Sequence, residues 1–386
     1  MAKLNDGYGP QFFLLDNLRA AVYSAAGYMN RFDMPRGTGP RRTTIRDVST
    51  LAGVSVATVS AVVNGKSVVS EELTQRVRRA IEALNYQPDF LARSLRMQRS
   101  HILGMVMPQL ASPYYAEVLR GVEDSASQHG YSILISNSRG DADQETKQVS
   151  ALVSRRVDGI LLASSNAHFA YHTLSTRHFP LVLFDRFPSG FTGTAVVTDN
   201  AQASHEATNH LIRLGHTRIA IIAGTPGISS AHERVEGFRS AMNEAGLMVR
   251  KEYFTRGNFN MKGGRECALE LMKLPSPPTA VFSHNYEMTL GLMRALTEVG
   301  VRCPQQVSVV GFDDFVVGMD GFSWATMFSP KLTCVAQSGY ELGQMAATVL
   351  LKKAGEKFGD SDGEEGIIKL RAELRVREST APPISP

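Results

Sequence analysis

The sequence has little cysteine, little net charge and no long hydrophobic run. Its three cysteines, Cys267, Cys303 and Cys334, are far apart in a chain of 386 residues, which fits neither a metal-binding motif nor a disulfide framework. We expect thiols that pack as small core residues in a reducing cytoplasm. No apolar run approaches the roughly 20 residues that span a bilayer, and the N-terminus lacks a basic start followed by an unbroken apolar stretch. We therefore expect a cytoplasmic protein with no membrane partner.

Composition is that of a globular protein, but the charge is unevenly distributed. Hydrophobic residues make up 43% of the chain and charged residues 20%, with a net charge of +4, and the length allows two or three domains. Between residues 41 and 99 there are ten basic and only five acidic residues. A basic module on a nearly neutral body is typical of nucleic-acid contact.

The start of this basic stretch has the pattern of two helices joined by a tight turn. Ile45, Val48 and Ala52 recur at helical spacing and predict the buried side of a short helix. Gly53 follows, and glycine tolerates the left-handed backbone that such a turn needs. Ser55 is well placed to cap a second helix.

The second helix is expected over Val56–Asn64, with Val59 and Val63 facing inward. A third helix is expected after Ser70, with a buried stripe made of Val77, Ala80, Ile81 and Leu84. Helices at this spacing occur in DNA-binding modules and in ordinary helical subdomains alike, so the spacing alone leaves both interpretations open.

A further short helix is predicted from Asp89 to Met97, after the break at Gln87 and Pro88. It carries apolar Leu91 and Leu95 but is too short to have a core of its own. An isolated helix of this length is marginal in water, so we expect it to order only against a partner.

The segments TIRDVSTLAGVSVATVSAVVNG and SEELTQRVRRAIEALNYQPDFLARSLR resemble the headpiece and hinge helix of the lactose-repressor (LacI/GalR) family. The resemblance implies a homodimeric repressor whose second helix enters the major groove of a palindromic operator, while paired hinge helices insert leucines into the minor groove. It implies contacts to double-stranded DNA from Thr44, Ser55, Val56, Ala57, Thr58, Ser60, Ala61, Asn64, Ala92, Arg93 and Leu95. Among these, Leu95 has the place of the inserted leucine.

Ala61 departs from the family pattern. Relatives commonly have arginine here, which can form a bidentate contact to guanine, whereas alanine offers only a small apolar contact, for example to a thymine methyl. We therefore expect operator half-sites that differ from the commonest pattern at this base pair.

Beyond His101 the pattern changes to alternating apolar strands and amphipathic helices. Strands are expected over 102–108, 131–137, 157–163, 181–185, 218–224, 279–283 and 307–314, and helices over 114–130, 144–155, 201–214, 233–245, 265–274 and 288–299. Such alternation predicts an α/β fold with parallel sheets covered on both faces. The count exceeds one comfortable sheet, so we expect two lobes, and the family resemblance implies a core like that of periplasmic binding proteins.

We divide the chain accordingly. Residues 43–88 form the helix-turn-helix domain, 89–100 the hinge helix and linker, 101–380 the two-lobed effector-binding and dimerisation core, and 381–386 a tail. Residues 1–42 form an extension that resembles nothing in the family. It is either an accessory helix or upstream sequence ahead of a start at Met34, and we favour the second interpretation.

Ligands in open α/β sheets bind beyond the carboxyl ends of the strands, and polar and aromatic residues follow several predicted strands. An arginine, carboxylates and aromatic rings suit a small polar molecule, although aspartates there often cap helices and aromatics often pack in cores. The family resemblance places an effector site, for a sugar or a sugar-derived or anionic metabolite, at Tyr114, Tyr115, Asp185, Ser230, Arg234, Phe259, Asn285, Tyr286 and Asp313. We expect Arg234 at the start of a helix.

Tyr286 is the second departure from the family. Sugar-responsive members usually have Asn-Asp at 285–286, and replacing that carboxylate with a phenol removes an acceptor and adds bulk. An anionic or aromatic-bearing effector is compatible with this change, and so is a pocket that no longer responds to any ligand.

No enzyme and no cofactor are expected. His205 and His210 in HEATNH are five residues apart rather than four, so they do not share a helix face as zinc ligands do. The sequence has no nucleophile elbow, phosphate loop or paired-carboxylate motif. The alternative to a repressor is a ligand-binding protein whose headpiece has lost its DNA function.

Overall fold

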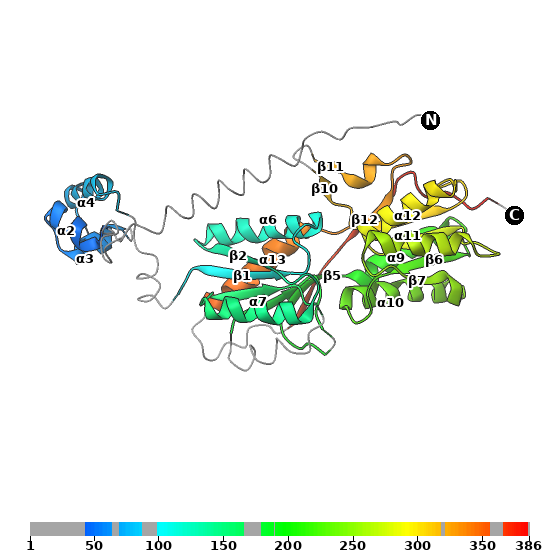
Figure 1. The fold of residues 1–386 in the computed structure, drawn as a ribbon, viewed down its shortest axis with the longest axis horizontal. Coiled ribbons are helices and arrows are strands. Elements are labelled where there is room, and N and C mark those ends of the chain that lie inside the picture. Colours follow the sequence, from blue (N-terminus) through cyan, green and yellow to red (C-terminus); the bar gives the residue numbers. More distant parts are fainter. Residues whose placement is uncertain are drawn as a thin grey trace, which may run out of the picture. The chain divides into compact units, whose positions relative to one another are not determined.

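The computed structural model describes residues 43–63, 69–86, 99–165, 179–188, 190–317, 321–355 and 366–384. The chain divides into two compact units, within residues 1–93 and 94–386 (Figure 1). The predicted extension and hinge helix, with Ala92, Arg93 and Leu95, and the predicted DNA contact Asn64 lie outside the described residues.

The first unit consists of the three predicted helices, α2 (Ile45–Ala52), α3 (Val56–Val63) and α4 (Glu71–Ala83). Helices α2 and α3 meet at 105°, within the range of a helix-turn-helix. Gly53 between them has φ 63°, the left-handed backbone expected of it. Val48, Val59, Val77 and Ala80 form the buried centre of the unit.

The second unit begins with a six-stranded parallel sheet in the order β13-β5-β4-β3-β1-β2. Its strands are β1 (Ile102–Met107), β2 (Ser132–Asn137), β3 (Gly159–Leu162), β4 (Leu181–Phe184), β5 (Ala195–Thr198) and β13 (Ile367–Leu370). Helices α6 (Pro113–Gln128) and α13 (Gly339–Gly355) cover one face, and α7 (Ala142–Ser154) covers the other (Figure 1). We call this body the first lobe.

The second lobe repeats the plan with the order β14-β12-β9-β8-β6-β7, in which only β14 is antiparallel. Its strands are β6 (Ile219–Ala223), β7 (Phe254–Arg256), β8 (Ala280–Ser283), β9 (Ser308–Phe312), β12 (Thr333–Ala336) and β14 (Glu373–Arg375). Helices α11 (Met261–Met272) and α12 (Tyr286–Glu298) cover one face, and α9 (Asn200–Arg213) and α10 (Ser229–Glu244) the other. The short pair β10 (Val316–Val317) and β11 (Phe322–Ser323) follows β9.

The chain passes between the lobes three times, before α9, before α13 and between β13 and β14. The helix that returns to the first lobe, α13, packs very closely on α6. A Cβ on Gly121 would lie 2.0 Å from the Tyr340 carbonyl oxygen, and one on Gly343 would lie 2.0 Å from that of Val118. Glycine is therefore required at both positions for the two backbones to meet.

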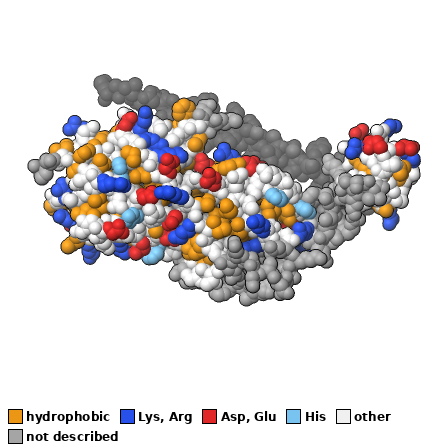
Figure 2. Space-filling view, turned by 180° about the vertical axis from the view of Figure 1, so that it is seen from behind, with side chains coloured by type: hydrophobic (Ala, Val, Ile, Leu, Met, Phe, Trp, Pro, Cys, Tyr) orange, Lys and Arg blue, Asp and Glu red, His pale blue; other side chains and the backbone are white. Residues whose placement is uncertain are grey.

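Three expectations from composition can be compared with the fold. Cys267 and Cys334 are free and buried in the core of the second lobe, as predicted, and Cys303 is half-buried. On the face of the second unit seen in Figure 2, basic and acidic side chains are interspersed. Among the described helices none alone is long and apolar enough to cross a membrane; α2 and α3 meet that criterion only as a pair, which is sharply bent.

Candidate functional site

A cleft of about 610 Å³ opens in the second unit, at the carboxyl ends of strands from both lobes. All nine predicted effector residues, which are spread over two hundred positions of the sequence, line it: Tyr114, Tyr115, Asp185, Ser230, Arg234, Phe259, Asn285, Tyr286 and Asp313. The structure therefore brings together every residue of the predicted site.

Asp185 and Asp313 occupy equivalent positions in the two lobes, directly after β4 and β9. Both have left-handed backbone, with φ 63° and 70°, and both are 8% exposed. Such a conformation is uncommon for a residue other than glycine. Asp185 Oδ2 accepts a 2.6 Å hydrogen bond from the Tyr115 hydroxyl.

Asp313 is held by three neighbours. Its Oδ1 accepts a hydrogen bond from Gln337 Nε2 at 2.5 Å and lies 3.9 Å from Arg234 Nη2, while its Oδ2 accepts from the backbone N–H of Tyr286 at 3.3 Å. Burial raises the pKa of this carboxyl, and the Arg234 guanidinium opposes that rise. The carboxylate is thus fixed in place as a hydrogen-bond acceptor facing the cleft.

We expected Arg234 at the start of its helix, and this prediction was wrong. Helix α10 begins at Ser229, so Arg234 lies in its second turn, and it is only 4% exposed. Its Nε donates to Asn200 Oδ1 at 2.8 Å and its Nη1 donates to the His284 carbonyl oxygen. Its guanidinium carbon lies 3.6 Å from the centroid of the Phe312 ring. Arg234 therefore ties its own lobe together as well as lining the cleft.

The aromatic residues of the cleft differ in how they are held. Tyr114 is buried, and its hydroxyl finds no hydrogen-bond partner among the described residues. Tyr286 packs edge-on against Phe315 at 5.0 Å between ring centroids, and its hydroxyl donates to Glu287 Oε1 at 3.2 Å. Burial raises the pKa of Tyr286, so its phenol stays neutral.

Two predicted residues also have ordinary structural roles. Asn285 caps α12, because its Oδ1 accepts from the Met288 backbone N–H at 3.0 Å. Phe259 has φ 57°, and its ring lies where a Cβ on Gly224 would come within 2.1 Å of it. Both residues still line the cleft.

Sequence reasoning missed several polar residues of the cleft. These are Gln109, Ser112, Asn137, Arg139, Ser165, Arg186, Thr225, Asn258 and Gln337. Arg186 follows Asp185 directly after a predicted strand, so the rule that pointed to Asp185 could have found it. Gln337 follows β12, a strand that we did not predict.

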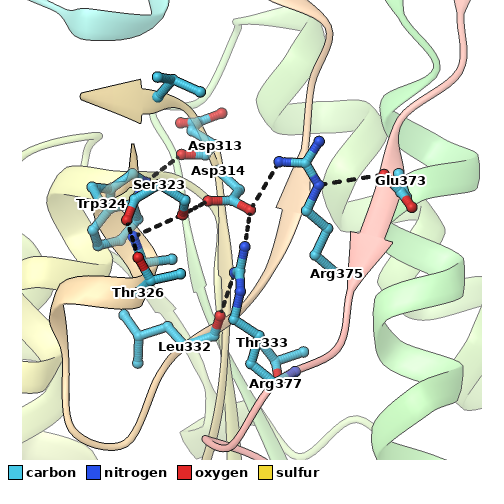
Figure 3. A network of polar contacts seen from close by, with 12 residues as sticks. Asp313, Asp314, Ser323, Trp324, Thr326, Leu332, Thr333, Glu373, Arg375 and Arg377 are labelled. Atoms are coloured by element: carbon cyan, nitrogen blue, oxygen red, sulfur yellow. Dashed lines mark hydrogen bonds and ion pairs between the residues drawn. The ribbon is translucent and has the colours of Figure 1, made fainter. Parts of the chain in front are cut away.

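A network of ion pairs lies directly behind Asp313 (Figure 3). The Asp314 side chain, which is fully buried, is 2.5 Å from Arg377 Nη2 and 3.3 Å from Arg375 Nη1, and Ser323 Oγ donates to it. The Trp324 indole N–H donates to the Asp313 carbonyl oxygen at 2.7 Å. The network ties the turn after β9 to the C-terminal strand β14 and the residues after it.

In the first unit, the predicted DNA contacts on α3 divide into capping and outward-facing residues. Ser55 Oγ accepts from the Thr58 backbone N–H at 3.0 Å and so caps α3, and Thr44 forms a capping box with Asp47 on α2. Among the other predicted contacts, the side chains of Val56 and Ala57 are exposed, and those of Ser60 and Ala61 are half-buried.

No cluster of residues able to hold a metal ion occurs in the part of the chain that the structure describes. The two histidines of HEATNH have separate partners: His205 Nε2 is 2.9 Å from Glu244 Oε2, and His210 Nε2 is 2.9 Å from Thr380 Oγ1.

Comparisons with known proteins agree on both units. Residues 44–89 match the bacterial regulatory proteins of the lacI family, and residues 100–372 match the periplasmic binding proteins and sugar binding domain of the LacI family. Together the matches define a DNA-binding transcriptional regulator with an effector-binding domain. The chain belongs to the LacI family, which confirms the resemblance stated from the sequence.

Relatives and solved structures cover most of the chain. The ribose operon repressor of Escherichia coli (strain K12) is 38% identical over 314 residues, 80% of this chain and 92% of the relative. The repressor PurR of Glaesserella parasuis is 36% identical over 340 residues, 87% and 98% of the two chains. The lac repressor dimer bound to operator and the anti-inducer ONPF superposes with a TM-score of 0.78 at 27% identity, covering 88% of this chain and all of the other. A complex of the regulator CelR with cellobiose has a TM-score of 0.64 at 30% identity and the same coverage.

Proposed function

We propose that this protein is a repressor that binds a palindromic operator as a homodimer and responds to a small polar effector in the cleft between its lobes. The observation that carries the proposal is the convergence of nine distant side chains on one cleft, in a chain that also has a helix-turn-helix unit. A ligand-binding protein without DNA function accounts for the cleft but gives the first unit no task.

Helix α3 is the element that enters the major groove in this proposal. Val56 and Ala57 expose apolar side chains near its start, suited to thymine methyl groups in the major groove. Thr44 and Ser55 cap the first turns of α2 and α3, where backbone N–H groups also favour phosphate. Thr58, Ser60, Ala61 and Asn64 complete the proposed surface, with Ala92, Arg93 and Leu95 of the hinge in the minor groove.

The cleft is the effector site in this proposal. The carboxylates of Asp185 and Asp313 accept hydrogen bonds from ligand hydroxyls, and Arg234 donates hydrogen bonds to ligand oxygens. Acceptors and donors held in fixed directions select a polyol. Tyr114, Tyr115, Ser230, Phe259, Asn285 and Tyr286 supply the rest of the wall. A structure of a LacI-family regulator with bound ribose and the complex of CelR with cellobiose support a sugar as the class of effector.

Control by the effector is a shift between two populations of the dimer. An effector that binds one lobe arrangement better than the other changes DNA affinity by its differential binding energy, typically about 1–3 kcal/mol or 5–150-fold. The protein would act in the cytoplasm, where its DNA lies, and we assign it no catalysis, in keeping with relatives that are repressors.

Selection of DNA from a random duplex pool, with the full chain at fixed salt, tests the proposal. We expect an enriched palindrome with a deformable central step, since paired hinge helices would bend it there. The affinity of that duplex would then be measured by fluorescence anisotropy with and without sugars. Absence of any enriched sequence, with and without ligands, would contradict DNA regulation and leave ligand binding as the function.

A further inference from the structure

Arg186 is the one charged residue lining the cleft that is buried and has no partner among the residues that the structure describes. It is 8% exposed, and its Nε is buried without a hydrogen bond. No ion pair or side-chain hydrogen bond joins it to another described residue. The other buried arginine of the cleft, Arg234, has Asn200 and the His284 carbonyl oxygen as acceptors.

A buried N–H of a guanidinium without an acceptor is costly. Arginine stays protonated in proteins, and the buried Nε of Arg186 gives up its hydration without gaining a hydrogen bond. The two carboxylates of the cleft already have protein donors: Tyr115 bonds Asp185, and Gln337 and the Tyr286 backbone bond Asp313. Neither carboxylate forms an ion pair with Arg186 among the described residues, so a ligand is free to supply the acceptor for its Nε.

Arg186 also lies close to the group that fixes Asp185. Burial and the charge of Asp185 raise the pKa of the Tyr115 phenol, and the positive charge of Arg186 opposes that rise. The guanidinium thus belongs to the same wall of the cleft as Tyr115. The Tyr114 hydroxyl, on helix α6 beside Tyr115, also finds no partner among the described residues, so the cleft has a second polar group without a hydrogen bond.

The formal charges of the cleft leave one positive charge in excess. Its lining includes three positively charged residues, Arg139, Arg186 and Arg234, and two negatively charged ones, Asp185 and Asp313. Arg139 is exposed and its charge is screened by solvent, so the two buried arginines face two buried carboxylates. A singly charged anion would add a charged acceptor for Arg186, which a neutral sugar would not. Guanidinium groups bind phosphate and carboxylate with paired, charge-assisted hydrogen bonds.

We infer that the effector is a small polyol carrying an oxyanion, a phosphate or a carboxylate, and that Arg186 binds that oxyanion. This inference rests on the proposed function, since it specifies the ligand of the same cleft. The hydroxyls of the polyol then donate hydrogen bonds to Asp185 and Asp313, whose negative charges would repel the oxyanion. The replacement of a carboxylate at position 286 by Tyr286 removes one further negative charge that would repel such a ligand.

Calorimetric titration of the full-length protein with matched sugars tests the inference. The probes are ribose against ribose 5-phosphate, and glucose against glucose 6-phosphate and glucuronate, so that one arm tests phosphate and another carboxylate. Three proteins are compared: the wild type, Arg186→Gln, and Arg155→Gln, which removes the same charge from an exposed position outside the cleft. Retained binding of the selected duplex shows that each variant is folded.

For the wild type and Arg155→Gln we expect at least one ionised sugar to bind at least tenfold more tightly than its neutral partner. Arg186→Gln should lose about 10- to 100-fold of affinity for that sugar, as expected for a lost hydrogen bond to a charged group, with little change for the neutral one. Neutral sugars that bind as well as ionised ones, a preference that survives Arg186→Gln, or binding of none of the five probes would each overturn the inference.

The DNA readout separates this inference from the proposed function. Release or recruitment of the duplex by a neutral sugar would keep the proposed function and refute the role of Arg186. An ionised sugar that binds through Arg186 but leaves DNA affinity unchanged would support the inference and contradict control by an effector.

Discussion

Replacing Asp314 by asparagine tests how the ion-pair network behind the cleft stabilises the second unit. The change keeps the shape of the side chain but removes its negative charge. Arg377, whose side chain is 15% exposed, then loses its charged partner and keeps only neutral acceptors, among them the Leu332 carbonyl oxygen at 2.7 Å. Arg375, 44% exposed, can turn to solvent and to Glu373.

The expected cost follows from this difference in exposure. Removing one partner of a buried ion pair costs about 3–5 kcal/mol, because the other charge is left uncompensated. Only Arg377 is left in that position here, so we expect the lower end, about 3 kcal/mol. For a unit of this size, about 2–4 °C per kcal/mol converts this to a fall of roughly 6–12 °C in Tm.

Thermal unfolding of the full-length protein, followed by tryptophan fluorescence, measures this change. Trp324 is the only tryptophan in the chain and belongs to the network itself (Figure 3). Glu373→Gln is the matched control, since it removes a 73% exposed carboxylate that lies 3.3 Å from Arg375, and exposed pairs contribute only about 0–1 kcal/mol. The reasoning is refuted if Asp314→Asn lowers Tm no more than Glu373→Gln does.

Four further changes test other parts of the structure. Ser55→Ala should lower the stability of the first unit by about 1 kcal/mol, because α3 loses its cap, and faster amide exchange across 56–63 would show it; unchanged exchange would contradict the capping role. Ala61→Arg should add a guanine preference of about 1–3 kcal/mol at one position of each half-site, so an unchanged selected sequence would show that the proposed register is wrong. Arg234→Lys keeps the charge but loses the paired geometry, so effector affinity should fall at least tenfold while operator affinity stays; full response would remove Arg234 from the site. Asp313 has a raised pKa in the folded protein, so it takes up a proton at higher pH than in the unfolded chain; acidification through that window does not destabilise the fold here, but it converts the acceptor carboxylate into a carboxylic acid. Effector affinity should therefore fall as the pH is lowered in the wild type, and fall less steeply in Asp313→Asn. Parallel profiles would falsify this role.

The strongest patterns in the sequence predicted the fold well. The three helices of the first unit were predicted from apolar residues at helical spacing. Strands β1, β3, β4, β6, β8 and β9 were predicted from apolar runs, since strands buried on both faces are almost wholly hydrophobic. The turn at Gly53 was predicted because only a few residue types tolerate its backbone. Helix ends were less accurate: α10 begins four residues before the predicted start, and this error misplaced Arg234 at a helix terminus.

The missed elements have weaker local patterns. Strand β5, with the sequence AVVT, is only four residues long, and β14 lies at the edge of its sheet. Helix α13 was missed, although 17 residues long, because its glycines have low helix propensity; their purpose, close contact with α6, involves residues two hundred positions away.

The candidate site was only partly readable from local patterns. Strand ends and the family resemblance pointed to nine residues that the structure does bring together. Arg186 directly follows a predicted strand and was within reach of the same rule, whereas Gln337 follows β12, which was not predicted. What distinguishes both from ordinary loop residues is their burial and the presence or absence of a partner. These properties arise only when both lobes are in place.

The equivalent positions of Asp185 and Asp313 have a consequence for how selective the cleft can be. Each carboxylate is presented by its own lobe, on the same kind of left-handed turn, so each lobe alone offers a ligand only half of the acceptors. A molecule that satisfies one half gains little until the other half reaches it. The cleft therefore selects its ligand by length and by hydroxyl spacing. A sugar one carbon too short leaves one of the two carboxylates without a hydroxyl to bind.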